Sequence, residues 1–476
     1  MQSKQVDVAI IGAGSAGLSA RREVEIRGKS YVLIDGGPLG TTCARVGCMP
    51  SKLLIAAAEV AHAAQHSAMF GVHVDGEVRV DGVEVMNRVR SERDRFVGFV
   101  VASVEGLPDD NLMQDRARFV GPTTLEVGTT TVNAGTVIIA TGSSPWIPPS
   151  LDAVRDRVKL NDDVFDWTDL PKSVAVVGTG VIALELGQAL HRLGTRVAFF
   201  NPFDAVGPTT DPDVSAKVTS VLGDELALHV GHESTFAPHG DDGVAVSWSD
   251  EAGEHTQTFD VLLCAAGRRP NLSGLNLEAT GVTLDKRGVP VFDEETMQVG
   301  DSPIFIAGDV NNDRPLLHEA ADEGRIAGVN AALFPELLRH KRRAGLGVAF
   351  TDPQIAVVGS AYGSLDQDEI MIGEVSYDDQ GRARVMGKNK GLVRVYARRS
   401  DAVLVGAEMF GPGVEHTAHL LAWCVQQRMT VSEILRMPFY HPVVEEGIRT
   451  AIRRVAAKLG VEYAPCASGL DCGPGV

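Results

Sequence analysis

The stretch that decides the fold is Val6-Asp7-Val8-Ala9-Ile10-Ile11-Gly12-Ala13-Gly14-Ser15-Ala16-Gly17. Its first half is a mostly apolar run with the length of a buried strand. Its second half has the spacing Gly-x-Gly-x-x-Gly, and a helical stretch and a second apolar run at 31–34 follow it. Glycines at Gly12, Gly14 and Gly17 let a strand turn sharply into a helix whose first N–H groups can hold a pyrophosphate. This region therefore predicts a βαβ unit that binds a dinucleotide.

A second copy of the pattern lies further along the chain. The apolar run 173–177 leads into Gly178-Thr179-Gly180-Val181-Ile182-Ala183, and a helix and a strand at 196–200 follow. Asp35 and Asn201 each stand 23 residues after the first glycine of their motif, close to where an acid binds a ribose hydroxyl. One glycine motif is weak evidence, because glycine-rich turns are common. Two copies in the same context predict two dinucleotide cofactors that exchange electrons.

The rest of the chain is organised around these two units. Residues 136–142 and 260–267 resemble returns of the chain into the nucleotide-binding sheets, and 304–309 reads as a buried strand ending in an acid. A helix is expected from about 315 to 332. Strand-like alternation at 392–396 and 402–408 then precedes helices near 414–427, 430–436 and 443–459. We predict an α/β protein with two Rossmann-like dinucleotide-binding domains and a C-terminal α+β domain.

Composition excludes several classes of protein. The 476 residues include 62 acidic and 44 basic side chains, and the net charge of -18 would repel nucleic acid and an anionic membrane. The sequence has no apolar stretch of about 18 residues and no N-terminal signal pattern. Six cysteines are too few and too scattered for a disulfide scaffold in a chain of this length. A cytoplasmic location is expected.

A pair of cysteines follows the first unit in Cys43-Ala44-Arg45-Val46-Gly47-Cys48-Met49-Pro50-Ser51-Lys52. The spacing does not match a zinc site, and no metal centre is predicted. It suits two sulfurs brought together at the start of a helix, whose positive end would lower the pKa of a reactive thiol. Alone, such a pair would be read as two inert buried cysteines. Beside two dinucleotide motifs we interpret it as a redox pair.

In combination these motifs resemble the FAD-containing pyridine nucleotide-disulfide oxidoreductases over about residues 5–460. The resemblance implies an FAD domain interrupted by an NAD(P) domain, then a dimerisation domain, and a homodimer. The expected boundaries are 1–150 with 270–340 for FAD, 151–269 for NAD(P), 341–464 for dimerisation, and 465–476 for a flexible Cys/Gly tail. The expected cofactors are FAD and NAD, with NADP possible.

The resemblance also assigns cofactor-binding residues. Gly12, Gly14 and Gly17 would hold the FAD pyrophosphate, Asp35 its adenosine ribose, and Lys52 would lie near the flavin, paired with Glu185. Further FAD contacts are expected at Ala117, Thr141, Gly142, Asp309 and Leu317. The implied NAD(P) site contains Gly178, Gly180, Asn201 and Gly267.

Four residues carry the implied chemistry. Cys48 would be the thiol facing the flavin and Cys43 the thiol that exchanges with substrate. The segment His441-Pro442-Val443-Val444-Glu445-Glu446 makes His441 the base and Glu446, rather than Glu445, its orienting partner. In the family this pair reaches the disulfide of the other subunit.

Within the family the sequence reads most like the dihydrolipoamide dehydrogenases, which oxidise dihydrolipoamide with NAD. The substrate would be a small dithiol or disulfide, and a lipoyl domain of a 2-oxoacid dehydrogenase complex is one candidate partner. Asn201 is neither the acid typical of those enzymes nor the Arg that binds a 2′-phosphate, so weak discrimination with NAD preferred is expected. One alternative is an NAD(P)H-dependent disulfide or mercuric-ion reductase that relays electrons through Cys466 and Cys472. Another is a non-catalytic flavoprotein subunit of a larger complex.

Overall fold

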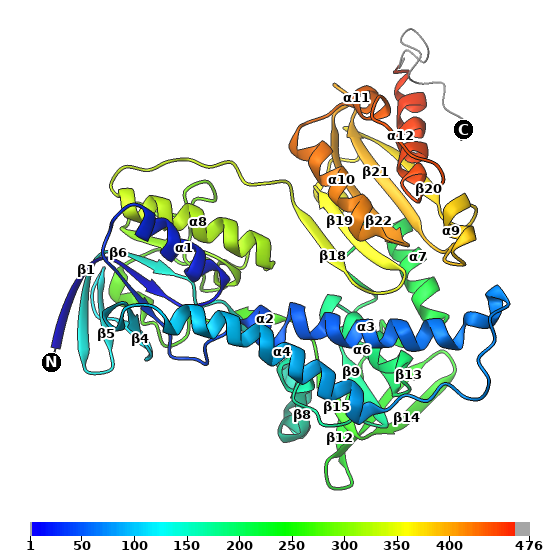
Figure 1. Ribbon diagram of the computed structural model, residues 1–476, viewed down its shortest axis with the longest axis horizontal. Helices are drawn as coiled ribbons and strands as arrows, with labels where there is room; N and C mark the ends of the chain where they lie inside the picture. Colours follow the sequence, from blue (N-terminus) through cyan, green and yellow to red (C-terminus); the bar gives the residue numbers. More distant parts are fainter. Residues whose placement is uncertain (1, 462–476) are drawn as a thin grey trace.

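The computed structural model describes residues 2–461 (Figure 1). Cys466 and Cys472, to which a relay was assigned above, lie outside the described residues. None of the helices within the described range is long and apolar enough to cross a membrane.

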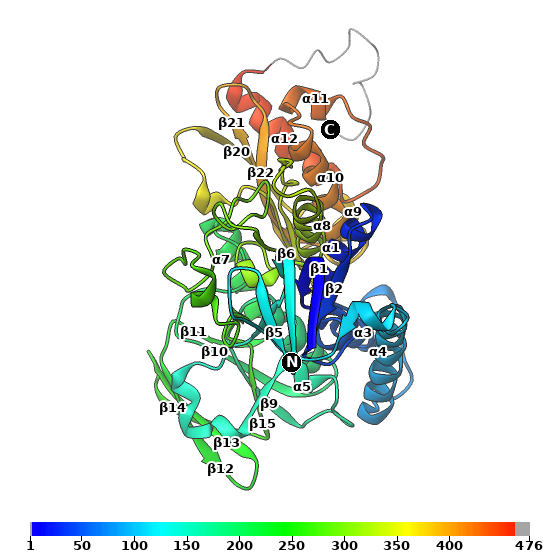
Figure 2. The same ribbon diagram turned by 90° about the vertical axis from the view of Figure 1, so that its left-hand side faces the viewer.

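The first sheet is built around the glycine motif at the N-terminus. Its strands are β1 (Gln2–Ile11), β2 (Tyr31–Ile34), β3 (Leu112–Met113), β4 (Ala117–Phe119), β5 (Thr124–Val127), β6 (Thr130–Ile139) and β17 (Ile304–Ile306). The order is β3-β2-β1-β6-β5-β4, with β17 pairing β6, and the strands β2, β1, β6 and β17 are parallel. Figure 2 shows β1 and β6 side by side. Helices α1 (Ser15–Ile26) and α8 (Leu317–Leu333) pack against each other beside this sheet.

The second sheet repeats the arrangement and is wholly parallel. Its order is β11-β10-β9-β15-β8, from β8 (Val158–Leu160), β9 (Ser173–Val177), β10 (Arg196–Asn201), β11 (Ala227–Val230) and β15 (Val261–Cys264). One face packs on an antiparallel layer of β12 (Ser234–His239), β13 (Gly243–Asp250) and β14 (Gly253–Phe259). Helices α5 (Asn161–Val164), α6 (Val181–Arg192) and α7 (Pro212–Gly223) complete the unit.

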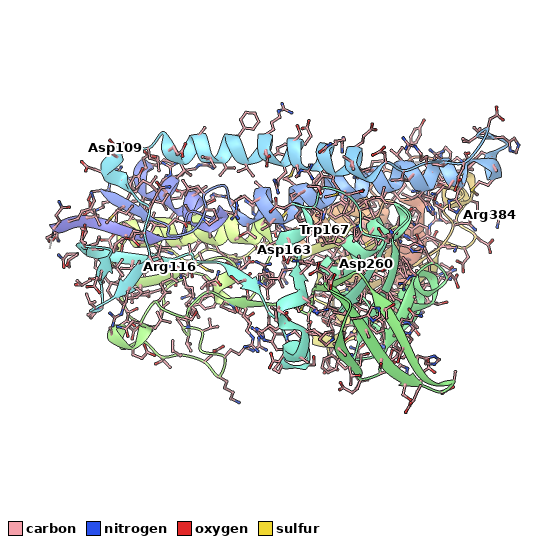
Figure 3. The ribbon with its side chains drawn as sticks, turned by 90° about the horizontal axis from the view of Figure 1, so that it is seen from below. Asp109, Arg116, Asp163, Trp167, Asp260 and Arg384 are labelled. Atoms are coloured by element: carbon pink, nitrogen blue, oxygen red, sulfur yellow. The ribbon has the colours of Figure 1, made fainter. Side chains whose placement is uncertain are left out.

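Two long helices join the two sheets. They are α3 (Cys48–Gln65), which follows the short α2 (Thr42–Val46), and α4 (Gly82–Glu105). Helix α3 packs on both α4 and α6, so the chain just after the first glycine motif is held against the second unit. Seen from below, α4 runs along one long side of the molecule and ends close to Asp109 (Figure 3). The short strands β7 (Ser143–Pro145) and β16 (Arg268–Pro270) pair where the chain crosses between the units.

The C-terminal part is a third layer with its own core. Its antiparallel sheet has the order β18-β19-β22-β21-β20, from β18 (Leu346–Ala349), β19 (Gln354–Gly359), β20 (Ile370–Ser376), β21 (Leu392–Arg398) and β22 (Leu404–Gly411). Helices α10 (Val414–Gln426), α11 (Val431–Leu435) and α12 (Glu446–Leu459) share one apolar cluster with it, and α9 (Gly381–Val385) follows β20. Short 3-10 turns occur at Ser67–Phe70, Asp109–Asn111, Pro149–Arg157, Leu277–Thr280, Asp309–Asn311 and Tyr362–Ser364.

This architecture confirms the predicted fold class. The main differences are at helix starts: α8 begins at Leu317 rather than near 315, and α12 begins at Glu446 rather than 443. The second shift has a local cause, because the Glu446 carboxylate accepts hydrogen bonds from His441 and Val443 and so holds the preceding residues in a loop. The predicted domain boundaries remain a prediction.

Candidate active site

The two cysteines of the predicted redox pair are brought together by a break between two helices. Helix α2 ends at Val46 and α3 begins at Cys48, with Gly47 between them. A Cβ at Gly47 would lie 3.1 Å from the carbonyl oxygen of Thr42 and 3.2 Å from the Cα of Cys43, so a side chain here would require the backbone of α2 to shift by a few tenths of an ångström. Both cysteines are thiols in this structure, and they share a hydrogen bond.

The two thiols differ in acidity. The hydrogen bond with Cys43, helped by the charge of Lys52, lowers the pKa of Cys48 to about 7, and local desolvation opposes this shift only in part. The same hydrogen bond, followed by burial, raises the pKa of Cys43 far above its ordinary value. Cys48 also occupies the first position of α3, where the helix dipole favours an anion. When one proton leaves the reduced pair, the thiolate therefore forms at Cys48.

Lys52 is held beside Cys48 by the second unit. Its Nζ lies 2.7 Å from Oε2 of Glu185, which α6 presents with only 5% of its surface exposed. The other carboxylate oxygen accepts a hydrogen bond of 2.9 Å from the backbone N–H of Phe350. The Phe350 ring lies under the ammonium group, 4.3 Å from Nζ to the ring centroid. This is the pairing that the resemblance implies, and its role beside a flavin remains a prediction.

The turn at Gly12–Gly17 fits the pyrophosphate of a dinucleotide. Gly14 is the N-cap of α1 and offers no side-chain cap, so the first N–H groups of the helix have no such partner. A Cβ at Gly14 would meet no atom within 4 Å, which leaves room for an anion against the helix end. Asp35 accepts hydrogen bonds from the N–H groups of Ala13 (2.6 Å) and Gly37 (2.8 Å). Its carboxylate is thereby fixed at the edge of this turn.

The structure brings Asp309 to the stretch 141–143. Oδ2 of Asp309 accepts a hydrogen bond of 2.8 Å from the Ser143 hydroxyl. That hydroxyl in turn accepts one of 2.9 Å from Nε of Arg268. The Thr141 hydroxyl donates to the carbonyl of Asn271 at 2.7 Å, and Gly142 adopts a φ of +68°. These contacts tie together three segments that are distant in sequence.

Sequence reasoning missed three residues around Asp309. Ser143 directly follows the predicted site residue Gly142, and Arg268 directly follows Gly267. No local sequence pattern indicates that Ser143 and Arg268 form a hydrogen bond with each other. Glu323 is fully buried in α8 and accepts hydrogen bonds of 2.7 Å from the Gly308 N–H and from Asn311 Nδ2. It thereby holds the loop that carries Asp309. A glutamate on a helix gives no sequence signal for such a role.

Two predicted FAD contacts have less distinctive surroundings. Ala117 is the buried first residue of β4, next to Arg116, which packs against Gly36. Leu317 is the first residue of α8 and is 45% exposed. Their assigned contacts with FAD remain predictions.

The second glycine turn, at Gly178–Ala183, has the same open space at the N-terminus of its helix. Gly180 is the N-cap of α6 without a side-chain cap, and a Cβ there would meet no atom within 4 Å. Gly267, in the segment after β15, adopts a φ of +120° and also borders open space. Asn201 ends β10, at the carboxyl edge of the parallel strands where dinucleotides bind. The residues present therefore fit a second dinucleotide.

His441 and Glu446 form a pair in the C-terminal part. Nδ1 of His441 lies 2.9 Å from Oε1 of Glu446, whose Oε2 accepts from the Val443 N–H at 3.2 Å. Gln380 holds the same loop by donating to the Val443 carbonyl at 2.8 Å. With Nδ1 engaged, Nε2 is the nitrogen of this exposed imidazole that can take a proton.

Within one chain, His441 and Glu446 do not lie next to Cys43 and Cys48. Helix α12, which begins at Glu446, packs on β20, β21 and α11 near the top of Figure 1. Helices α2 and α3, which carry Cys43 and Cys48, meet near the middle of the same view. A site that contains both groups needs a second copy of the chain.

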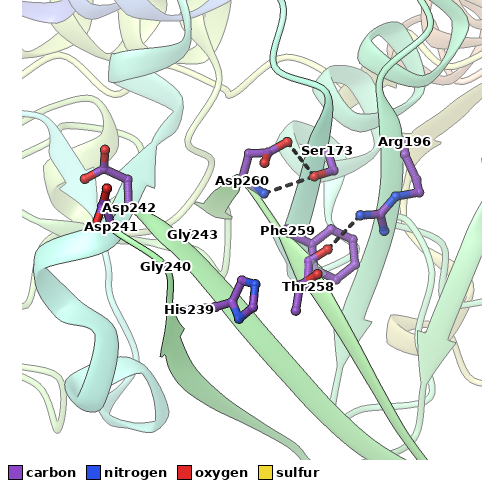
Figure 4. A pocket seen from close by; sticks show the side chains of 10 residues that line it. All are labelled: Ser173, Arg196, His239, Gly240, Asp241, Asp242, Gly243, Thr258, Phe259 and Asp260. Atoms are coloured by element: carbon purple, nitrogen blue, oxygen red, sulfur yellow. Dashed lines mark hydrogen bonds between the residues drawn. The ribbon is translucent and has the colours of Figure 1, made fainter.

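A pocket of about 370 Å³ lies elsewhere on the second unit (Figure 4). It is at the amino ends of the parallel strands, where Ser173 begins β9 and Arg196 begins β10. Two of its polar side chains bond to the protein: Ser173 Oγ to Asp260 at 2.7 Å, and Arg196 to the Thr258 carbonyl at 2.6 Å. Because dinucleotides bind at the carboxyl ends of such strands, this pocket is not the nucleotide site.

Comparisons with known proteins identify the family of this chain. A family model described as pyridine nucleotide-disulphide oxidoreductase matches residues 6–324, and one for the dimerisation domain of these proteins matches 346–452. A dihydrolipoyl dehydrogenase of Halobacterium salinarum is 30% identical over 468 residues, covering 94% of this chain and 96% of that protein. One of Bacillus subtilis is 29% identical over 460 residues, covering 94% and 97%.

Solved structures show the same fold. The Cu(II) complex of the HOCl-induced flavoprotein disulfide reductase RclA from Escherichia coli superposes with a TM-score of 0.80 at 20% identity. The match covers 94% of this chain and 99% of that one. Together with the match to the family model over most of the chain, this leads to one conclusion: the chain belongs to the pyridine nucleotide-disulphide oxidoreductase family.

Proposed function

We propose that this flavoprotein is a dihydrolipoyl dehydrogenase, which oxidises dihydrolipoamide with NAD. Proteins of this family use FAD and NAD(P), and bound FAD supplies the two-electron chemistry between thiols and nicotinamide. The observation that carries the proposal is the unequal thiol pair, Cys43 and Cys48, beside the Lys52–Glu185 ion pair. Such a pair is arranged to exchange with a dithiol. A cytoplasmic location, where thiols are kept reduced, accompanies the proposal.

The proposed cofactor sites follow from the two open turns. Gly12, Gly14 and Gly17 with Asp35 and Asp309 would hold FAD, and Gly178 and Gly180 would hold the nicotinamide dinucleotide. The fit rests on the two uncapped helix ends and on the absence of any described atom within 4 Å of a Cβ at Gly14 or Gly180.

The exchange step uses the difference in acidity. A substrate thiolate attacks Sγ of Cys43 in the oxidised pair, and the Cys43–Cys48 bond breaks with Cys48 leaving as thiolate. The sulfur with the lower pKa is the better leaving group, which favours attack at Cys43. The second substrate thiol then attacks the substrate sulfur bound to Cys43, which closes the substrate disulfide and releases Cys43 as a thiol.

His441 is the proposed base for this step. The exchange releases two protons from the substrate, one of which returns to Cys43 because its pKa is raised. Nε2 of His441 takes the other, and the Glu446 carboxylate at Nδ1 stabilises the imidazolium that forms. Since one chain separates His441 from the cysteines, we place His441 of the partner subunit at each thiol pair. The dimerisation domain at 346–452 supports a homodimer.

A steady-state comparison tests the proposal. The FAD-loaded protein is assayed with dihydrolipoamide and NAD or NADP, and in the reverse direction with glutathione disulfide and other disulfides. Turnover with dihydrolipoamide and NAD should exceed all other combinations, and a free lipoyl domain should serve as a second substrate. Cys43→Ser should abolish this turnover, while the matched variant Cys424→Ser should not. Faster reduction of another disulfide by NADPH would overturn the assignment of substrate.

A further inference from the structure

The carbonyl of Val46 lies in the turn between the two cysteines and cannot be paired by its own helix. Val46 is the last residue of α2, and a helix leaves the carbonyls of its last turn without N–H partners. In a continuous helix this carbonyl would accept from the N–H four residues later, but that residue is Pro50, which has no N–H. Because Val46 is buried, an unpaired carbonyl here would cost free energy. A partner must come from another part of the chain.

Asn161 of the second unit is that partner. It is the first residue of α5 and directly follows β8, the edge strand of the parallel sheet. Its Nδ2 donates to the Val46 carbonyl at 3.1 Å, and the residue is only 5% exposed. A carbonyl can only accept, so the nitrogen end of the amide must face it. A hydrogen bond from the second unit therefore closes the turn that separates the two cysteines.

The segment that carries Asn161 is firmly held. Phe165, which follows α5, is buried in the same apolar cluster as Val46. Oδ2 of Asp163 accepts from the Leu160 N–H at 2.7 Å and fixes the bend between β8 and α5. From the other side, Arg93 of α4 donates to the Phe165 carbonyl at 3.1 Å. The amide can therefore hold the redox turn in place instead of moving with it.

The two redox states of the cysteine pair depend differently on this hydrogen bond. In the disulfide form the Cys43–Cys48 bond keeps the turn closed, so the Val46 carbonyl stays buried whether or not it has a partner. In the dithiol form the turn can open, and an unpaired carbonyl can then reach water. Loss of the amide would therefore destabilise the disulfide relative to the dithiol, by the cost of an unpaired buried acceptor.

We infer that Asn161 is a positioning residue that stabilises the disulfide state of Cys43 and Cys48 by pairing the Val46 carbonyl. It acts through the backbone of the turn rather than on a sulfur atom. The unit that offers a turn for the nicotinamide dinucleotide thus also shifts the redox equilibrium of the pair. The inference rests on the proposed function in one respect, that Cys43 and Cys48 form a disulfide.

A redox equilibrium without the substrate tests this inference. The FAD-loaded protein and its Asn161→Leu variant are equilibrated anaerobically with mixtures of reduced and oxidised dithiothreitol, alkylated, and mapped by peptide mass. Dithiothreitol gives two electrons and two protons to the Cys43–Cys48 bond and closes its own disulfide. Leu keeps the size of the side chain but has no donor. The ratio of reduced to oxidised dithiothreitol at half-reduction should fall by roughly fivefold or more, the range for an unpaired buried acceptor.

Asn161→Ala separates a hydrogen bond from simple packing. The smaller side chain leaves room for a water between the Val46 carbonyl and Oδ1 of Asp162, which lies 2.9 Å from Nδ2 of Asn161. Because a bridging water replaces much of the lost hydrogen bond, the half-reduction ratio should fall by only roughly twofold. If Asn161 merely filled space, the cavity in Asn161→Ala would have the larger effect.

The acidity of Cys48 gives an independent measurement. Its hydrogen bond with Cys43 lowers its pKa to about 7. An open turn separates the two sulfurs, so the pKa of Cys48 in reduced Asn161→Leu should rise toward the ordinary value of a thiol. The pH dependence of Cys48 alkylation measures this shift, which a role confined to the packing of α5 would not produce.

The matched variant Asp163→Ala controls for damage to α5. It removes the contact with the Leu160 N–H but leaves the amide of Asn161 in place, so its half-reduction ratio should equal that of the unmodified protein. An unchanged ratio in either Asn161 variant, a larger shift in Asn161→Ala than in Asn161→Leu, or an equal shift in Asp163→Ala would overturn the inference. Absence of the disulfide from the oxidised, unmodified protein would contradict the proposed function as well.

Discussion

The two glycine units of this chain share a backbone but differ in what lies at the end of the second strand. Gly12 and Gly178 adopt φ values of +111° and +105°, and a Cβ would come within 2.3 Å of the Ala140 carbonyl and 2.7 Å of the Ala265 carbonyl, respectively. Both turns therefore require glycine. In the first unit Asp35 binds the backbone of the turn, whereas in the second Asn201 binds the Thr179 side chain.

This difference separates the role of the glycines from the role of the other residues in the motif. The glycines determine the turn and the room for a pyrophosphate, and they are the same in both units. The second residue of each motif contacts the residue at the strand end: Asp35 accepts from the backbone N–H of Ala13, whereas Asn201 donates to the side-chain hydroxyl of Thr179. Only the second contact depends on the type of side chain at that position.

The strongest test of the comparison places a side chain in the open space of each glycine turn, one turn at a time. Apart from the neighbouring residues in the chain, no described atom lies within 4 Å of a Cβ at Gly14 or Gly180, so Gly14→Ala and Gly180→Ala should fold and clash only with a ligand. Gly14→Ala should lose bound flavin, and Gly180→Ala should keep it while binding of NADH falls by roughly 100-fold or more. Flavin absorbance per protein and calorimetry with NADH measure the two effects. Loss of both cofactors from either variant would contradict the separation of the sites.

His441→Ala should produce the next largest effect. Turnover with dihydrolipoamide should fall by roughly 100-fold or more, the range for a lost proton-transfer group. Because His441 touches neither glycine unit in the described structure, flavin content and NADH affinity should not change. The matched variant His416→Ala, exposed on α10, should behave like the unmodified protein. Near-normal dithiol turnover in His441→Ala would assign the base to another group.

A smaller effect is expected where the two units meet, at Lys52 and Glu185. The pKa of Cys48 is lowered to about 7, so its thiolate is present above that pH and is protonated as the pH falls. Lys52→Met should raise this pKa by roughly one unit, because an adjacent positive charge is removed. The pH dependence of Cys48 alkylation, followed by peptide mass in the reduced protein, gives the value. Lys286→Met, at an exposed position, is the control, and an identical profile in both variants would remove Lys52 from the electrostatics of the thiol.

The sequence predicted those strands and helices that depend mainly on neighbouring residues in the chain. The strand ranges 31–34 and 173–177 coincide with β2 and β9, because each is a short apolar run ended by a turn. The contacts of Glu323, Arg268 and Phe350 could not be predicted, since each depends on a partner from a distant segment. Asn201 shows the same limit at one residue: the sequence gives its position, but only the fold shows which end of its amide is occupied.

The most direct test of the central claim follows the thiols themselves. The oxidised, FAD-loaded protein is treated anaerobically with dihydrolipoamide, alkylated, and mapped by peptide mass, with an untreated sample as reference. The account predicts that new labels appear at Cys43 and Cys48 together, and that subsequent addition of NAD before alkylation removes both. New labels confined to Cys466 and Cys472, or none at Cys43 and Cys48, would contradict it.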